Sequence, residues 1–324
     1  MKAFLLAAGR GTRFLPVTRF LPKPLFPFLN VPLARAHLMR LAAAGVQEAG
    51  LNLHHRGGQI VGELSQGTSD LPKLRFFEEA TILGTAGALR NAAPLLAGGD
   101  FLLVNSDTAI APDYAALLRR HRESGCAVTL LLVENREPER FTPVAVEGDL
   151  VTGFGAASAR PLLYTGVCAM SADLLPRIPE GFASLVSDLW EPLLRETPGR
   201  IGWVLHSGSF ADLGRPGDFL RATIEALERG DSFPAGSGSF DARRRVLERL
   251  PGAAPEARAC VLGDVRVGPD ARLEQCAIWS GSFVGRGARL RRVVMAGGEV
   301  PEGANHEEAL LWGEPGNAAM PFPL

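Results

Sequence analysis

The sequence lacks three features that would each point to a particular class of protein. It has no run of about 20 apolar residues, so no membrane-spanning helix is predicted. The formal net charge is only −1, and a chain with no basic field is not expected to bind nucleic acid. The four cysteines have neither CxxC spacing nor the density of a disulfide scaffold, which indicates reduced core residues of a cytoplasmic protein.

What is present is the composition of an ordinary globular protein. Apolar residues make up 46% of the chain and charged residues 21%, values typical of packed domains. The apolar run at residues 3–8 is too short for a secretion signal. Because 324 residues exceed the usual size of a single core, we expect two domains.

The opening stretch, residues 5–32, carries the clearest chemical signal. A buried strand is followed by a turn containing Gly9 and Gly11, whose backbone N–H groups are suited to surround an anion. Arg13 offers a planar fork for phosphate oxygens, and Lys23 offers a point charge. Five prolines stiffen the segment, which therefore predicts a phosphate site and not a linker.

Two common phosphate motifs do not fit this stretch. No Gly-Lys-Ser/Thr string is present, which excludes a P-loop. A dinucleotide fingerprint needs a third glycine where this chain has Phe14, and a helix where it has prolines. A proline-rich surface loop with incidental charges is the remaining simple alternative.

The stretch resembles the signature of the sugar-1-phosphate nucleotidyltransferases. The matching strings are Ala7-Ala8-Gly9-x-Gly11-Thr12-Arg13, Pro16-x-Thr18 and Pro22-Lys23-Pro24. The resemblance implies that Arg13 binds the β- and γ-phosphates of a nucleoside triphosphate and that Lys23 binds near the α-phosphate. It also implies nucleotide contacts through the loop residues Ala7, Ala8, Gly9, Gly11 and Thr12.

A second segment, GTAGAL at residues 84–89, begins a predicted helix. Thr85 is a suitable N-cap, and the N–H groups at the start of such a helix can bind a ligand. A simple capped helix explains the same pattern. The resemblance favours a ligand role, with Gly84 and Thr85 at the nucleotide and Gly87 at the sugar phosphate.

Two aspartates are candidate metal ligands. Asp107 follows the buried strand 101–104, at the end of a parallel strand where ligands bind in open α/β sheets. Taken alone, it could equally be a turn residue or a helix cap. The resemblance makes it a metal ligand together with Asp212, whose segment is similar to the family's Trp-x-Asp-x-Gly with Phe210 in place of the tryptophan. One or two carboxylates plus substrate phosphates form a typical Mg²⁺ site.

The segment Tyr164-Thr165-Gly166 resembles the family's sugar-contacting segment. Many members carry Glu-Lys-Pro upstream, where the lysine meets the sugar phosphate, whereas this chain has Ala159-Arg160-Pro161. Arg160 is a candidate substitute for that lysine.

The C-terminal part contains a repeat. A Val-Gly pair at Val267 recurs at Val284, and a related string follows at Val300. One apolar residue about every six, with small residues at the corners, is typical of hexapeptide β-helices. The repeat resembles the left-handed β-helix attached to many nucleotidyltransferases, a module that can also mediate homo-oligomers. A short basic helix is expected before it, at residues 243–249.

The resemblance implies the overall organisation. We expect a Rossmann-like, mainly parallel sheet with helices on both faces, followed by a short left-handed β-helix. The expected boundaries are 1–230 for the catalytic domain, 231–257 for a linker and short helix, 258–313 for the β-helix and 314–324 for a tail.

The implied reaction joins an NTP and a sugar 1-phosphate into an NDP-sugar and pyrophosphate, with Mg²⁺. GTP and mannose 1-phosphate are the favoured pair, and UTP with N-acetylmuramate 1-phosphate is the alternative, along with other hexose or heptose 1-phosphates. A non-catalytic sugar-nucleotide sensor would keep the same scaffold but is expected to lose the loop cations. A β-helix acyltransferase would need a longer β-helix than this repeat provides.

Overall fold

The computed structural model describes residues 1–155, 161–230, 234 and 236–324. By its internal contacts the chain forms two compact units. The sheet unit comprises Met1–Arg10 and His37–Phe210, and the tail unit comprises Gly11–Ala36 and Ala211–Leu324. The opening loop therefore belongs with the C-terminal part. The domain boundaries expected from the sequence remain a prediction.

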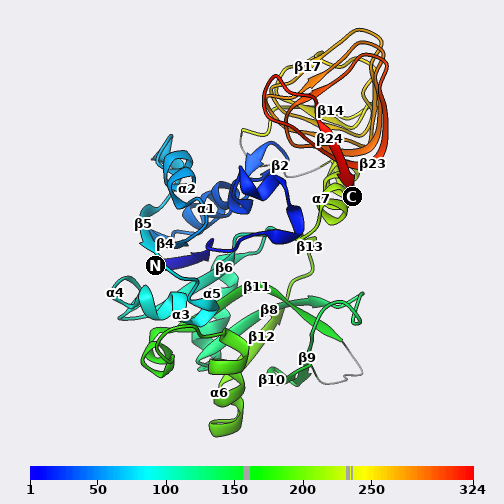
Figure 1. Cartoon of the computed structure of the whole chain (residues 1–324). Helices are drawn as coiled ribbons and strands as arrows, with labels where there is room; N and C mark the ends of the chain where they lie inside the picture. Colours follow the sequence, from blue (N-terminus) through cyan, green and yellow to red (C-terminus); the bar gives the residue numbers. More distant parts are fainter. Residues whose placement is uncertain (156–160, 231–233, 235) are drawn as a thin grey trace. The chain divides into compact units, whose positions relative to one another are not determined.

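A nine-stranded sheet forms the centre of the sheet unit (Figure 1), with the order β5-β4-β1-β6-β11-β8-β12-β10-β9. The strands are β1 (Lys2–Leu6), β4 (Glu48–Leu53), β5 (Lys73–Glu78), β6 (Asp100–Asn105), β8 (Val128–Glu134), β9 (Pro143–Glu147), β10 (Leu150–Phe154), β11 (Leu162–Ser171) and β12 (Ile201–Leu205). These strands are rich in Val, Leu and Phe, the residues that suit a sheet covered on both faces.

The expectation of a mainly parallel sheet is wrong for half of it. Strands β5, β4, β1 and β6 are parallel to one another, and β8 is parallel to β12. Strand β11 lies antiparallel between β6 and β8, and β10 is antiparallel to both β12 and β9. Strands β9 and β10 are joined by a tight turn at Gly148, and antiparallel neighbours need only such short connections. The sheet is therefore mixed.

Helices cover the sheet from two sides. Phe4 and Leu103 point into an apolar core that also contains Leu89 of α3 (Gly84–Asn91). Helix α5 (Tyr114–Ser124) lies on the opposite face, because His121 contacts the Thr129 hydroxyl (2.8 Å), next to the core residue Leu130. The other helices are α1 (Leu33–Ala43), α2 (Gly57–Leu64), α4 (Ala93–Leu96), α6 (Glu191–Glu196) and, in the tail unit, α7 (Pro216–Arg229).

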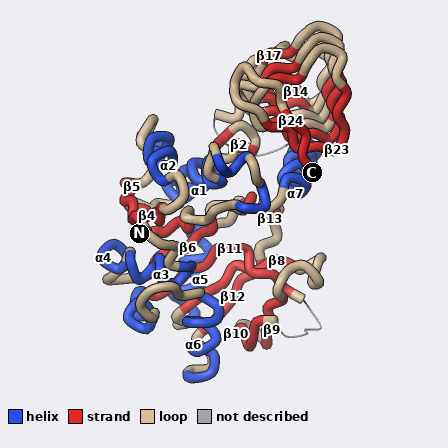
Figure 2. The backbone as a smooth tube through the Cα atoms, in the orientation of Figure 1, coloured by secondary structure: helices blue, strands red, loops and turns tan. Residues whose placement is uncertain are grey.

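The tail unit contains a stack of short strands, shown in red in the tube of Figure 2. Successive coils pair in parallel, and paired residues lie 16 or 17 positions apart in the chain. The register pairs Val267 with Val284 and Val284 with Val300, the residues that the repeat predicts to be equivalent. The stack contains β16 (Val261–Leu262), β17 (Arg266–Val267), β18 (Arg272–Glu274), β19 (Ala277–Ile278), β20 (Phe283–Val284), β21 (Arg289–Met295), β22 (Glu299–Val300) and β23 (Asn305–Trp312).

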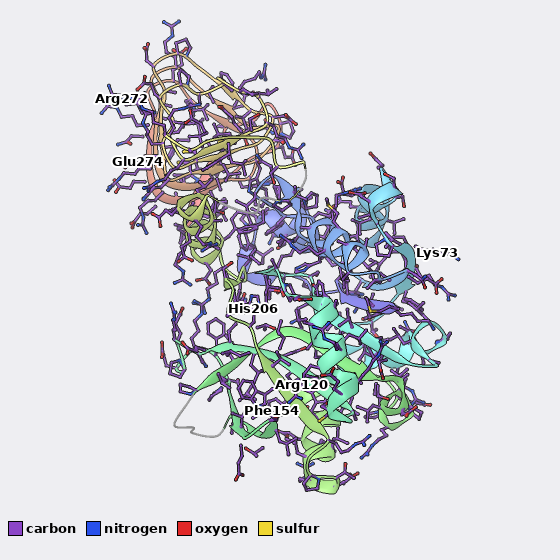
Figure 3. The ribbon with its side chains drawn as sticks, turned by 180° about the vertical axis from the view of Figure 1, so that it is seen from behind. Lys73, Arg120, Phe154, His206, Arg272 and Glu274 are labelled. Atoms are coloured by element: carbon purple, nitrogen blue, oxygen red, sulfur yellow. The ribbon has the colours of Figure 1, made fainter. Side chains whose placement is uncertain are left out.

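Side chains alternate along these strands. Leu273 is buried, whereas its neighbours Arg272 and Glu274, labelled in Figure 3, are exposed. Strand β24 (Met320–Pro323) closes one edge of the stack as the antiparallel partner of β23. The inward-facing residues form an apolar core of their own, so the tail does not need the sheet for its interior.

The predicted basic helix at residues 243–249 is wrong. Strands β14 (Ser239–Asp241) and β15 (Val246–Glu248) form an antiparallel pair there. Arg244 is held in the connecting turn by ion pairs with Asp241 (2.6 Å) and Glu248 (3.0 Å). Arg244 therefore stabilises a turn, and Val246 is fully buried.

No helix in the described part of the chain is long and apolar enough to cross a membrane. All four cysteines are free and buried, as the sequence predicts: Cys126 and Cys168 in the sheet unit, Cys260 and Cys276 in the tail unit. Burial raises the pKa of the Cys168 thiol to about 12 and raises that of Cys276 as well.

Candidate functional site

The carboxyl end of β1 is fixed by a buried polar network in the sheet unit. The Ala7 N–H donates to Asn52 Oδ1 (2.7 Å), and Asn52 Nδ2 donates to Glu79 Oε1 (2.8 Å). The second oxygen of Glu79 accepts from the Leu83 N–H (2.9 Å), just before α3. The network thus ties the predicted nucleotide residues Ala7 and Gly84 to one framework.

Asn52 and Glu79 were not among the site residues expected from the sequence. Both residues are about 5% exposed. Asn52 lies in β4, one residue before its end, and Glu79 directly follows the parallel strand β5, so both lie at the carboxyl ends of neighbouring strands. That position in the chain was the available signal, because polar residues at the carboxyl ends of adjacent parallel strands meet at one edge. Their hydrogen bonds make them positioning residues.

Helix α3 begins differently from the prediction. Thr85 does not act as the N-cap; Leu83 occupies that position without a side-chain bond, and Thr85 Oγ1 accepts from the Leu185 N–H (2.9 Å). The N–H groups of Ala86 and Gly87 are not free for a ligand, because both donate to the Ala183 carbonyl (2.9 and 3.2 Å).

Gly84 and Gly87 allow the start of α3 to lie close to the backbone of residues 181–183. A Cβ on Gly84 would lie 2.5 Å from the Ala183 carbonyl oxygen, and one on Gly87 would lie 2.5 Å from that of Gly181. Larger residues are therefore excluded by packing. Ligand contacts at Gly84, Thr85 and Gly87 stay predictions.

Asp107 follows β6 and is partly buried. Hydrogen bonds fix the residues before and after it in the chain. Ser106 Oγ donates to the Leu6 carbonyl (2.7 Å), and His37 Nε2 donates to the Thr108 carbonyl (2.9 Å). Burial and the nearby Arg40 lower the pKa of His37 from 6.5 to about 4, so the ring is neutral at pH 7. The aspartate therefore sits on a rigid turn.

The segment Tyr164-Thr165-Gly166 lies within β11. Thr165 Oγ1 donates to the Leu131 carbonyl (2.8 Å), and Gly166 has φ +81°, with its missing Cβ only 2.7 Å from the Asn105 amide. Only glycine fits there. The Tyr164 ring packs edge-on against Trp190 (5.3 Å between centroids), and burial raises the pKa of its hydroxyl. Arg160 lies outside the described residues.

In the tail unit, Arg13 and Asp212 meet beside Gly214. Asp212 Oδ1 accepts from the Gly214 N–H (2.6 Å). A Cβ on Gly214 would lie 2.6 Å from that oxygen and 2.7 Å from Arg13 Cζ and Nη1. A predicted phosphate ligand and a predicted metal ligand, 199 positions apart in the chain, are thus brought together.

Lys23 and Gly11 also lie close together in this unit. Gly11 has φ +60°, and its missing Cβ would lie 2.8 Å from Thr18 Cγ2 and 3.4 Å from Lys23 Cβ. The Thr18 hydroxyl donates to the Gly11 carbonyl (3.1 Å). The loop is folded back on itself through three 3₁₀ turns, with Lys23 only 6% exposed and Thr12 at the surface.

No group of three or more His, Cys, Asp or Glu side chains within the described ranges could hold a metal ion by itself. The chemistry of Asp212 fits a partial metal site, since one oxygen is anchored by a backbone N–H and the carboxylate is a hard oxygen donor. Asp107 and Asp212 belong to different units. The metal-binding pair therefore stays a prediction.

Comparison with known proteins identifies related sequences. Residues 2–155 match the nucleotidyl transferase family. The mannose-1-phosphate guanylyltransferase of Mycobacterium tuberculosis is 28% identical over 90% of this chain and 83% of its own length. The mannose-1-phosphate guanyltransferase of Emericella nidulans is 29% identical over 69% of this chain, which spans 63% of that relative.

A solved structure shares the fold. A candidate glucose-1-phosphate thymidylyltransferase from Bacillus anthracis, in complex with sucrose, superposes with a TM-score of 0.64 at 19% identity. The match covers 73% of this chain and 98% of that structure. The fold is therefore the mixed α/β fold of nucleotidyltransferases. The family match over residues 2–155 and the relatives along most of the chain agree with the signature loop, and together they support a sugar-1-phosphate nucleotidyltransferase.

Proposed function

We propose that this enzyme joins GTP and mannose 1-phosphate into GDP-mannose and pyrophosphate. The observation that supports the proposal is the meeting of Arg13 and Asp212 at Gly214, where a guanidinium group lies close to a carboxylate. The choice of GTP and mannose rests on the two relatives, both of which are mannose-1-phosphate guanylyltransferases by name.

The reaction needs positioning more than proton transfer. An oxygen of the sugar phosphate attacks the α-phosphorus of GTP in line, and the bond from that phosphorus to the departing pyrophosphate breaks. Both oxygens are already ionised near neutral pH, so no strong general base is required. Alignment and neutralisation of charge supply the catalysis.

Each cation has a role in this scheme. The exposed Arg13 fork would bind the β- and γ-phosphates bidentately and stay with the leaving pyrophosphate. Lys23 would neutralise charge near the α-phosphate. Gly9, Gly11 and Thr12 supply a loop in which backbone N–H groups can approach phosphate oxygens closely.

Enzymes of this family generally use a divalent metal ion, and we infer that the metal here is Mg²⁺. Asp107 and Asp212 would hold it, and the ion would neutralise the triphosphate. Two carboxylates without further protein donors are typical of Mg²⁺, which keeps water and substrate phosphates in its shell.

We place the sugar phosphate at Gly87, Tyr164, Thr165 and Gly166. Support comes from the close packing of Gly166 on Asn105, which fixes that backbone at the end of β6. The assignment of Arg160 as a substitute for the missing lysine remains a proposal.

The C-terminal stack is proposed to be a left-handed β-helix, which would also offer a surface for a homo-oligomer. Support comes from the parallel pairing of residues that lie 16 or 17 positions apart, the length expected for one coil of the helix. We also propose the domain boundaries given by the sequence, a cytoplasmic location and no binding of nucleic acid, in keeping with a net charge of −1.

A pyrophosphate-release assay tests the function. Purified protein with Mg²⁺ is tested with GTP, UTP, dTTP, ATP and CTP against mannose, glucose, N-acetylglucosamine and N-acetylmuramate 1-phosphates. Release with GTP and mannose 1-phosphate only is the expected result. Release only with UTP and N-acetylmuramate 1-phosphate would establish the alternative, and Mg²⁺-dependent NTP binding without release would indicate a sensor.

A further inference from the structure

We propose that the C-terminal stack positions the loop of residues 11–36, which carries Arg13 and Lys23. Two sets of contacts, one made by Asn30 and one by Trp279, hold the loop against the stack, and we call them together the latch. The inference rests on the proposed function for the roles of Arg13 and Lys23. Its structural basis is that the loop, residues 11–36, is part of the tail unit.

The first part of the latch is an aromatic cluster. Trp279, which directly follows β19, packs against Phe26 (4.9 Å between centroids) and Phe219 of α7 (5.7 Å). Phe26 in turn packs edge-on against Phe14 (4.7 Å). Phe14 and Phe26 are fully buried, and Trp279 is only 6% exposed. A side chain of the stack therefore supports two aromatic residues of the loop.

These two aromatic residues flank the loop cations in the chain. Phe14 directly follows Arg13. Phe26 is tied to Lys23 by a backbone bond from its N–H to the Lys23 carbonyl (3.0 Å). A shift of the Phe14–Phe26 pair would thus move the backbone that carries both cations.

The second part of the latch is a hairpin tip. Strands β2 (Pro27–Phe28) and β3 (Val31–Pro32) are antiparallel and joined by Leu29 and Asn30. Asn30 Nδ2 donates to the carbonyls of Ser237 (3.0 Å) and Leu262 (2.9 Å), and Arg249 Nη2 donates to the Asn30 carbonyl (2.7 Å). Figure 1 shows β2 near the start of the stack.

Both residues of the tip have left-handed backbone. Leu29 has φ +52° and Asn30 has φ +64°. Asparagine tolerates this conformation, but leucine does so at a cost. Leu29 is nevertheless buried in a cluster with Leu227, Leu247 and Val261. The strained turn persists because its partners in α7 and the stack hold it.

A third contact lies at the surface. Phe20, in the middle of the loop, stacks on Trp312 at the end of β23 (4.3 Å, 21° between planes). The loop is thus held at three places by the C-terminal part: Phe20, Phe26 and the hairpin tip. Because these contacts act on the backbone around Arg13 and Lys23, Asn30 and Trp279 are positioning residues and not catalytic ones.

The test uses the full-length protein and two readouts. Asn30→Gly removes both side-chain hydrogen bonds but keeps the left-handed turn, which glycine adopts freely. Trp312→Ala removes the surface stack with little risk to folding, and Trp279→Leu is compared with the conservative Trp279→Phe. Amide exchange of residues 11–26 and the KM values for GTP and for mannose 1-phosphate are measured for each.

The matched control is Asn135→Ala in the sheet unit. Asn135 is equally buried, and its side chain makes two hydrogen bonds: Nδ2 donates to the Phe141 carbonyl (3.0 Å) and Oδ1 accepts from the Glu137 N–H (3.1 Å). Its loss should leave amide exchange in residues 11–26 unchanged, because none of these contacts touches the loop.

We expect Asn30→Gly to speed amide exchange in residues 11–26 and to raise the KM for GTP about tenfold, a change within the range expected for two lost hydrogen bonds. The KM for mannose 1-phosphate should stay unchanged, and Trp279→Phe should restore most of what Trp279→Leu loses. Exchange like that of the wild type in folded Asn30→Gly and Trp312→Ala would overturn the latch. If the wild type turns over no substrate pair, the proposed function fails, and amide exchange still decides the latch.

Discussion

The two units position their functional side chains in different ways. In the sheet unit, Asp107 closely follows β6, and β6 is paired with β1 on one side and with β11 on the other. In the tail unit, Arg13 and Lys23 lie on a loop with no long strand, held by aromatic packing and a hairpin tip. A sheet provides rigidity through its register, whereas the loop depends on contacts with residues more than 200 positions away.

Among the variants of the sheet unit, we expect Asp107→Asn to have the largest effect. The amide keeps the shape of the carboxylate but loses its charge, so we expect kcat to fall by about 10²–10³ with thermal stability unchanged. Turnover is measured across a Mg²⁺ titration. Wild-type turnover at saturating Mg²⁺ would remove Asp107 from the metal site.

Lowering the pH is a second test of the sheet unit, because it should protonate the buried His37 and destabilise the fold around Asp107. The folded-state pKa of His37 is about 4 against 6.5 in the unfolded chain, so its contribution to stability is complete above pH 6.5 and is lost as the pH falls toward 4. The ring faces Arg40, which opposes protonation, and Asp107, which favours it. Protonation would also add an N–H at the buried Nδ1, which has no hydrogen-bond partner among the described residues.

We therefore expect the free energy of unfolding to fall by up to about 3 kcal/mol across this range because of His37. Denaturant unfolding of the wild type and of His37→Gln at pH 7, 5.5 and 4.5 measures the effect. The glutamine does not titrate, so its stability should depend less on pH. Equal slopes in the two proteins would contradict the assignment.

The loop side is tested by Gly214→Ala. The added methyl group would meet the ends of the Arg13 and Asp212 side chains, which are flexible enough to move aside. We expect kcat/KM to fall by about ten- to a hundredfold through misplacement of both groups, with little change in melting temperature.

Gly217→Ala is the matched control for that variant. It lies three residues further along, at the start of α7, where an added Cβ would make only an ordinary contact at 3.7 Å. Its activity should equal that of the wild type. Equal losses in the two variants would show that Gly214 matters for helix α7 and not for the Arg13–Asp212 pair.

The smallest effect is expected on the surface of the stack. Arg291 and Glu307 form an ion pair between β21 and β23, but both side chains are about half exposed. Such pairs contribute about 0–1 kcal/mol, so Glu307→Gln should barely shift the melting temperature. A large shift would mean that charge pairing, and not the apolar interior, stabilises the stack.

The sequence was most informative where periodicity or motif spacing is local. The repeat predicted the pairing of Val267, Val284 and Val300, because coil equivalence depends only on position along the chain. The antiparallel insertion of β11 could not be predicted, since pairing direction depends on neighbours distant in sequence. The same reason hid the role of Asn52 and Glu79 and the occupied N–H groups of α3.

The association of the loop with the C-terminal stack was also beyond the sequence. Trp279 lies within the C-terminal repeat, and nothing in the neighbouring sequence points to its contact with Phe26. The prediction of a helix at residues 243–249 failed for a similar reason. The ion pairs of Arg244 with Asp241 and Glu248 stabilise a turn between two strands, and the sequence alone does not show them.

The buried cysteines have a practical consequence. Two lie in each unit, their side chains are at most 9% exposed, and thiol reagents react with exposed thiolates. The native protein should therefore resist alkylation, and a cysteine becomes reactive only when its own unit opens. Mass spectrometry of Cys126 and Cys168 against Cys260 and Cys276 would then record, without any added dye or mutation, which half of the molecule unfolds first.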